Sequence, residues 1–301
     1  MSEAQRKASL IALCALVLGA WFAGASTLFV RLSELGPIAT AFHRVFLSVP
    51  ALLVLVAWRP DGGLDGGGQP GDAREFAILA LAGAFFAGDL IFWHLAIMNT
   101  TVANATLLAT MAPIYVTVGM FALFGERPSG WFLAGMALAI FGAVLLIGDT
   151  VAFSPERVLG DVYGVVTGLF FAGYLITVSR LRSRLTTGAV MFWSTVVTAL
   201  ILLPIAWLWE GELTAVTLYG WAVLVALALV SHVGGQGLIA YALAHLPTAF
   251  SSLTMVLEVF AAAFLGWVFL NEPLGLWQWA GAAVIIAGLV VARRGGAKFQ
   301  W

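Results

Sequence analysis

The chain has 301 residues, a formal net charge of −1, 62% hydrophobic residues and only 10% charged residues. A soluble domain carries about 25% charged residues, so this composition excludes a protein with a water-exposed surface. The near-neutral charge gives no electrostatic footprint for nucleic acid, and no nucleic-acid partner is expected.

The first predicted element is an apolar segment that follows Arg6 and Lys7 and continues to about residue 30. Its basic start and the small residues at 23–25 are also features of a cleavable signal peptide. The apolar run is longer than the core of a signal peptide, and its second half takes part in the internal repeat described below. We therefore interpret it as a retained membrane helix.

Further apolar segments follow along the whole chain, each close to the about 20 residues that a spanning helix needs. Backbone groups in lipid must bond internally, and these continuous apolar runs lack the alternation of barrel strands. We predict an all-α integral membrane protein with ten transmembrane helices, at residues 8–30, 37–57, 75–97, 101–123, 130–148, 159–180, 187–208, 218–243, 247–270 and 275–292.

The first half of this pattern recurs in the second half. Glu126, Trp131, Gly135 and Gly142 return at one constant offset as Glu272, Trp277, Gly281 and Gly288. An odd-numbered repeat must sit in the bilayer upside down relative to its twin, and inverted repeats are typical of alternating-access carriers. We predict one five-helix repeat over 1–149 and a second, inverted repeat over 150–301, around a central cavity.

The orientation follows from the basic residues. With the N-terminus in the cytoplasm, only Arg31 and Arg157 lie on the opposite side, and both termini are cytoplasmic. The cytoplasmic set is larger and consists of Arg6, Lys7, Arg59, Arg74, Arg127, Arg180, Arg182, Arg184, Arg293, Arg294 and Lys298.

Several motifs in this order resemble the EamA-type members of the drug/metabolite transporter superfamily. They are Ala112-Pro113 followed by Gly125-Glu126-Arg127, Leu257-Glu258 followed by Asn271-Glu272-Pro273, and His43-Arg44-Val45-Phe46. The resemblance implies a multi-pass carrier of small metabolites in a bacterial inner membrane. It also implies a cavity surrounded by helices one to four and six to nine. One departure is that Val259 stands where the first half has Pro113, so we expect any helix break there not to be symmetric.

Charged residues inside the membrane are costly and usually face a cavity or a partner. Arg44 and Asp89 lie at similar depth, so they form either a structural ion pair or a site in which Arg44 receives a substrate carboxylate. Glu258 lies near the middle of the ninth helix. It is either a receptor for a substrate ammonium or a proton, or a structural residue bonded to a neighbouring helix or to Arg44.

Other polar residues in these helices are His43, His94, His232 and Gln236. A lone His in a bundle is more often a packing residue, although it can tune charge near neutral pH. The spacing of the histidines predicts no metal site. The glycines at 234, 235 and 237 indicate either tight packing or a hinge.

Aromatic residues at mid-helix positions are either cavity walls or packing residues. These candidates are Trp21, Phe22, Tyr115, Phe171 and Tyr174. Aromatic walls would suit flat or bulky apolar side chains.

The function that follows is a secondary transporter that exports small metabolites, with aromatic or large neutral amino acids as the leading substrates. The alternative is an efflux carrier for hydrophobic cations or drugs. No nucleophile–base cluster predicts an enzyme, no polar stripe predicts a channel, and no cofactor is expected. The expected partners are a small-molecule substrate and the lipid bilayer, with the chain a monomer or weak oligomer.

Overall fold

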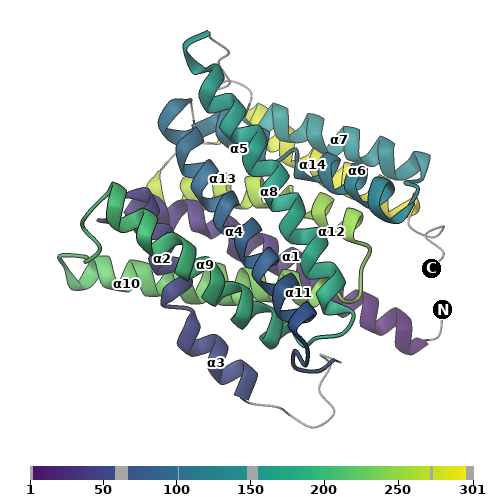
Figure 1. The fold of residues 1–301 in the computed structure, drawn as a ribbon. Helices are drawn as coiled ribbons and strands as arrows, with labels where there is room; N and C mark the ends of the chain where they lie inside the picture. Colours follow the sequence, from purple (N-terminus) through teal and green to yellow (C-terminus); the bar gives the residue numbers. More distant parts are fainter. Residues whose placement is uncertain (1–2, 58–66, 101, 148–154, 272–273, 296–301) are drawn as a thin grey trace.

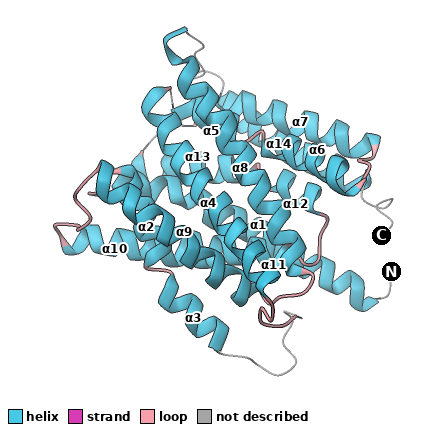
Figure 2. Cartoon of the chain, in the orientation of Figure 1, coloured by secondary structure: helices cyan, strands magenta, loops and turns pink. Residues whose placement is uncertain are grey.

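The protein is described from a computed structural model, in which residues 3–57, 67–100, 102–147, 155–271 and 274–295 are placed. These residues are almost entirely helical (Figure 2). They contain ten segments that are long and apolar enough to cross a membrane, which confirms the predicted all-α architecture. We number the segments span 1 to span 10, at Arg6–Leu32, Pro37–Ala57, Ala73–Asn99, Asn104–Phe124, Gly130–Ile147, Val158–Arg182, Thr187–Trp209, Leu218–Ala242, Thr248–Leu270 and Leu276–Arg294.

Most spans are single α-helices, whereas spans 2, 4, 8 and 9 are interrupted. The continuous ones are α1 (Glu3–Leu32), α4 (Ala73–Asn99), α7 (Gly130–Ile147), α8 (Val158–Arg182), α9 (Thr187–Trp209) and α14 (Leu276–Gly295). The interrupted ones comprise α2 (Pro37–Phe46) with α3 (Val49–Ala57), α5 (Val102–Ala109) with α6 (Ala112–Phe124), α10 (Leu218–Ala226) with the π-helix η3 (Leu227–Gln236) and α11 (Gly237–Ala242), and α12 (Thr248–Thr254) with α13 (Leu257–Leu270).

Spans 4 and 9 break at matching places, so the expected asymmetry between them is wrong. The α5–α6 junction falls at 110–111, directly before Ala112-Pro113. The α12–α13 junction falls at 255–256, within one residue of the equivalent position and without a proline. Hydroxyl groups bond back to the preceding turn at both places: Thr110 Oγ1 donates to Thr106 O (2.6 Å) and Thr254 Oγ1 donates to Phe250 O (2.9 Å). Such back-bonding competes with the helix ladder and bends helices, so a proline is not needed for a break.

The far ends of these two spans also match. The C-cap of α6 is Gly125 at φ 72°, and the C-cap of α13 is Asn271 at φ 55°. Both residues adopt the left-handed conformation that ends helices, and glycine and asparagine tolerate it best. This backbone requirement explains the Gly/Asn step in the two motifs.

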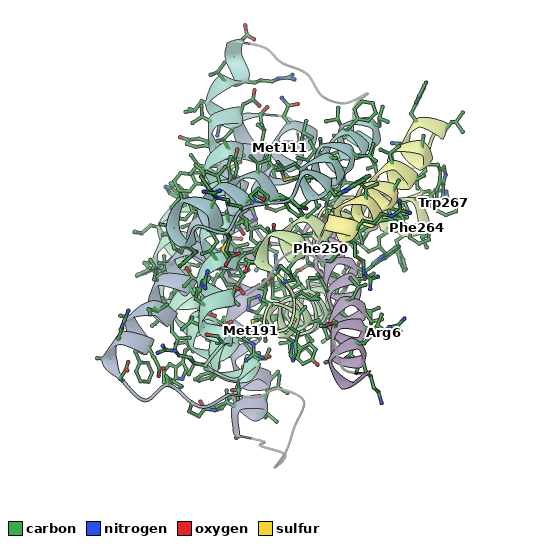
Figure 3. All side chains as sticks on the ribbon, turned by 90° about the vertical axis from the view of Figure 1, so that its right-hand side faces the viewer. Arg6, Met111, Met191, Phe250, Phe264 and Trp267 are labelled. Atoms are coloured by element: carbon green, nitrogen blue, oxygen red, sulfur yellow. The ribbon has the colours of Figure 1, made fainter. Side chains whose placement is uncertain are left out.

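Helices from the two halves are interleaved in space (Figure 1). α1 packs mainly against η3 and α13, while α8 packs mainly against α4 and α5. α7 and α14 form the most extensive helix pair and lie together with α6 at the upper right of Figure 1. Phe264 and Trp267 of α13 lie beside the α14 ribbon (Figure 3), and the Trp267 ring is 6.0 Å from that of Trp279.

Glycines allow α7 and α14 to touch through their backbones. A Cβ atom added at Gly135 would lie 2.3 Å from Ala292 N and 2.5 Å from Gly288 O. A Cβ atom added at Gly142 would lie 2.6 Å from Ile285 N and 2.7 Å from Gly281 O. Small residues are the usual basis of close helix contact in lipid, where the hydrophobic effect does not drive helices together.

Replacing Gly135 with alanine is expected to destabilise the protein by about 1–3 kcal/mol, because the new methyl group would overlap backbone atoms of α14. Gly130→Ala is the matched control, since a Cβ atom added at Gly130 meets no heavy atom within 4 Å. The measurement is the thermal unfolding temperature of both variants in detergent. Equal unfolding temperatures for the two variants would contradict this account of the helix contact.

Two loops at one end of the molecule cap each other's helices. Glu210, which follows α9, accepts hydrogen bonds from Ile38 N (2.9 Å) and Ala39 N (2.7 Å) at the start of α2. Glu34, which follows α1, accepts bonds from the Thr217 hydroxyl and from Thr217 N (3.1 Å) at the start of α10. These hydrogen bonds, chiefly the one from the Thr217 side chain, hold the pKa of Glu34 below its ordinary value. Carboxylates at helix N-termini satisfy free N–H groups and the positive end of the dipole.

Candidate functional site

A cavity of about 130 Å³ lies between the two halves of the chain. Its lining comes from spans 1, 2, 3, 4, 6, 8 and 9. The residues of α1 that line it belong to the last turns of that helix, and those of α8 lie near its middle. The cavity is therefore displaced toward the end at which α1 finishes and α8 begins. Five of the sequence candidates line it, namely Arg44, Asp89, Phe171, Gln236 and Glu258.

Arg44 is 9% exposed and sits just before the interruption of span 2. Ser48 causes part of this interruption, because its hydroxyl bonds both Arg44 O (2.5 Å) and Ala228 O (3.2 Å). The Arg44 guanidinium lies 5.7 Å from the centre of the Phe86 ring. Among the residues that the structure describes, its Nε finds no hydrogen-bond partner. A cation–π contact compensates a guanidinium only partly, so Arg44 keeps donor capacity for a ligand.

Asp89 and Glu258 are the acidic residues of the cavity wall. Each is partly exposed to the cavity. Among the described residues, no ion pair within 4.0 Å joins either carboxylate to Arg44. The ion-pair alternative for Arg44 and Asp89 is therefore not realised in this conformation.

The broken helices place two N-termini at the cavity. Ala112 and Pro113 begin α6, and Glu258 belongs to the first turn of α13. The break at 255–256 is what brings Glu258 to the wall, since its amide bonds Met255 O (2.9 Å) in a tight turn. Half-helix N-termini carry partial positive charge and free N–H groups, and carriers use them to bind anionic substrate groups.

The histidine candidates are bonded within the helix bundle. His43 Nδ1 bonds Ala39 O (2.9 Å), and His94 Nδ1 bonds Leu90 O (2.5 Å). His232 Nε2 bonds Thr195 Oγ1 (2.8 Å) and thereby joins span 8 to span 7. In the described chain, none of these three histidines lines the cavity, which agrees with their interpretation as packing residues.

In the part of the chain that the structure describes, four of the five aromatic candidates do not line the cavity. Trp21 packs edge-on against Phe264, with ring centres 5.4 Å apart, and Phe22 is 38% exposed beside Gly234. The Tyr115 ring covers Gly168. Tyr174 is buried behind the wall, where its ring lies 4.8 Å from Phe86 and 6.2 Å from Phe171.

Sequence reasoning missed Phe86 and Trp93, two aromatic residues of the cavity wall. Both share a face of α4 with Asp89, because residues three and four apart on a helix are neighbours. The same rule, applied to Pro113, would have found Thr106 and Thr110 in span 4. Helical spacing would therefore have identified these residues once one cavity residue of each helix was known.

Residues 10–148 and 158–294 match the sequence profile of the EamA-like transporter family. The chain belongs to this family. It is therefore a multi-pass membrane protein and a transporter, as the resemblance implied. The two matched regions together cover most of the chain and each contains one set of broken-helix motifs.

Curated relatives share about a quarter to a third of their residues with the chain. It is 25% identical over 217 residues to the pseudopaline exporter CntI of Pseudomonas aeruginosa, covering 72% of this chain and 75% of that protein. It is 27% identical to an uncharacterized transporter of Archaeoglobus fulgidus, over 93% and 95% of the two chains. It is 30% identical to a probable amino-acid metabolite efflux pump of Escherichia coli, over 63% and 67%.

One solved protein structure superimposes on the chain with a TM-score of 0.79 and covers 98% of this chain and 100% of the other. At 19% identity, this likeness establishes the fold and nothing about the cargo.

Proposed function

We propose that the chain exports amino acids, with aromatic or large neutral ones as the main cargo, by alternating access through the cavity. The observation that carries the proposal is a cavity inside the membrane region with one arginine, two carboxylates and aromatic walls. Groups of both signs at one enclosed site suit a zwitterion. We place this transporter in a bacterial inner membrane as a monomer or weak oligomer, with both termini on the cytoplasmic side where the basic residues are concentrated.

Reciprocal packing supports a twofold relation between the halves, and the five spans of each half make that relation an inverted one. Gly135 contacts Gly288. Their equivalents in the other repeat, Gly281 and Gly142, contact each other in the same way. Likewise α1 packs on spans 8 and 9, and its equivalent α8 packs on spans 3 and 4. A twofold axis between two oppositely oriented halves produces this exchange of neighbours.

Within the cavity, we assign the substrate carboxylate to Arg44. A guanidinium fork binds a carboxylate at two points. The substrate ammonium then faces Glu258 and Asp89. Its side chain lies among Phe86, Trp93 and Phe171, which offer the flat apolar surfaces that aromatic and large aliphatic groups prefer.

The opposite end of the molecule is closed by contacts within the second half and by one set of contacts between the halves. Ser179 Oγ and Thr248 Oγ1 are 2.6 Å apart, and Arg182 Nε donates to Ala240 O (3.1 Å). Arg180 pairs with Glu126 at 3.1 Å and stacks 3.5 Å from the centre of the Phe124 ring. In an alternating-access cycle these contacts form the cytoplasmic gate, which must open when the cavity closes on the other side.

A second candidate function, efflux of hydrophobic cations, is favoured by the excess of carboxylates over arginine in the cavity. Carboxylates and aromatic faces are sufficient to hold a lipophilic cation. The two functions differ in whether the cargo must carry a carboxylate.

The proposed function is tested by counterflow in liposomes that contain the purified protein. Liposomes preloaded with unlabelled phenylalanine are expected to accumulate labelled phenylalanine from outside faster than empty liposomes, because only a carrier couples the two movements. A lipophilic cation loaded in place of phenylalanine is the comparison for the second candidate. Equal uptake into loaded and empty liposomes would contradict a carrier mechanism for amino acids.

A further inference from the structure

The polar lining of the cavity consists mainly of hydrogen-bond acceptors. Three hydroxyl groups of the wall donate hydrogen bonds to backbone carbonyls of the preceding turn. They are Thr110 to Thr106 O (2.6 Å), Thr167 to Tyr163 O (3.0 Å) and Ser252 to Ala249 O (2.8 Å). Each hydroxyl has a single proton, so lone pairs are what these groups offer to a ligand. The carboxylates of Asp89 and Glu258 add further acceptors.

Gln236 is the residue of span 8 that lines the cavity, and its side-chain oxygen is an unsatisfied hydrogen-bond acceptor. It is 3% exposed, and no group in the described ranges of the chain donates a hydrogen bond to its Oε1 atom. A buried amide oxygen without a partner destabilises a fold, so its presence calls for a ligand or a function.

The backbone around Gln236 is specialised to present it. Gln236 is the last residue of the π-helix η3, and π-helical turns occur frequently at functional sites. Gly235 lies so close to α1 that a Cβ atom there would be 2.9 Å from Ala23 N. This contact fixes the π-helical turn against α1 and leaves the next side chain facing the cavity.

Donors are few by comparison. The donors of the wall are the Arg44 guanidinium, the Trp93 indole, the amide nitrogen of Gln236 and the hydroxyls of Ser26 and Thr27. The acceptors are the four oxygens of two carboxylates, the amide oxygen of Gln236 and the hydroxyl lone pairs. Once Arg44 holds a substrate carboxylate, the rest of the wall requires a cationic donor with several protons. A primary ammonium has three such protons, whereas an acylated amine has one and no charge.

We propose that Gln236 is a specificity-determining residue that accepts a hydrogen bond from the primary ammonium of the cargo, opposite Glu258. This inference rests on the proposed function and narrows it to cargo with a free, protonated amine. The cavity thereby rejects N-acylated amino acids and amine-free acids of the same shape, because both leave the acceptors unsatisfied.

The amine requirement is tested on the unmodified protein with four compounds of similar size. They are L-phenylalanine, phenethylamine, N-acetyl-L-phenylalanine and 3-phenylpropionate. Thermal stabilisation of the purified protein reports binding without transport, so the outcome does not depend on counterflow. Phenylalanine and phenethylamine are expected to stabilise the protein at concentrations at least about tenfold lower than the other two, since hydrogen bonds to charged groups are worth about this factor or more. Equal stabilisation by all four compounds, or by none, would overturn the inference.

The role of Gln236 itself is tested with Gln236→Leu. This variant is expected to weaken phenylalanine binding about tenfold and to leave 3-phenylpropionate binding unchanged, because only the former has the ammonium. Gln236→Glu restores an acceptor and is expected to recover phenylalanine binding. Gln278→Leu, the same change in α14 outside the cavity, is the control.

A purely structural role would give a different pattern. In that case Gln236→Leu would weaken both compounds alike, and Gln236→Glu would not recover phenylalanine binding. Either result would overturn the assignment of Gln236. If the compounds bind as expected but no counterflow occurs, the proposed transport function is wrong. The proposed recognition of the primary ammonium at Gln236 is then still supported.

Discussion

Replacing Glu258 with glutamine is expected to reduce phenylalanine transport at least about 30-fold, which corresponds to the roughly 2 kcal/mol of a hydrogen bond to a charged group. Glutamine keeps the shape of the side chain and its place in the first turn of α13, so the change removes charge alone. The loss is expected because a substrate ammonium inside the membrane needs a carboxylate partner. Initial rates of counterflow in liposomes measure it.

Glu212→Gln is the matched control for this experiment, because Glu212 is exposed in the loop before α10. Its transport is expected to equal that of the unmodified protein. Wild-type rates in Glu258→Gln at every pH tested would show instead that Glu258 is a neutral structural residue. The proposal that Glu258 receives the substrate would then be withdrawn.

Replacing Arg44 with lysine is expected to reduce phenylalanine binding about tenfold or more, although the charge is kept. Lysine is a point charge and lacks the planar fork that binds a carboxylate at two points. Phenethylamine, which has no carboxylate, is expected to bind the variant as well as it binds the unmodified protein. Thermal stabilisation by the two compounds measures the difference.

Arg184→Lys is the control for Arg44→Lys, since Arg184 is exposed between α8 and α9. A structural role of Arg44 makes a contrasting prediction. If Arg44→Lys transports phenylalanine normally but unfolds at a lower temperature, Arg44 stabilises the bundle through Asp89 in some state of the cycle. The carboxylate-receptor role would then be wrong.

The sequence was sufficient to predict the spans and the family. Each span agrees with its predicted range to within a few residues, because the bilayer demands an uninterrupted apolar segment of fixed length and rejects an unpaired backbone. The capping residues Gly125 and Asn271 marked the ends of spans 4 and 9 for an equally local reason. The rarity of charges in lipid also singled out Arg44, Asp89 and Glu258, which the structure brings to one cavity.

The sequence did not predict which aromatic residues face the cavity. Phe86 and Phe171 line the cavity, whereas Trp21 and Phe22 do not. In a soluble protein the polar face of a helix would tell these positions apart. Here both faces of each helix are apolar, one toward lipid and one toward protein, so the pattern does not reveal which face points inward.

The sequence by itself thus determined the membrane location, the number and limits of the spans and the family, because these follow from local composition and backbone chemistry. Only the tertiary structure decided which side chains meet. It showed matching breaks in spans 4 and 9, an Arg44 that is free of a close ion pair, and a π-helical turn that presents Gln236. The surroundings of Arg44 and the π-helical turn depend on contacts between helices distant in the chain, such as Ser48 with Ala228 and Gly235 with Ala23. No single stretch of sequence contains both partners of such a contact.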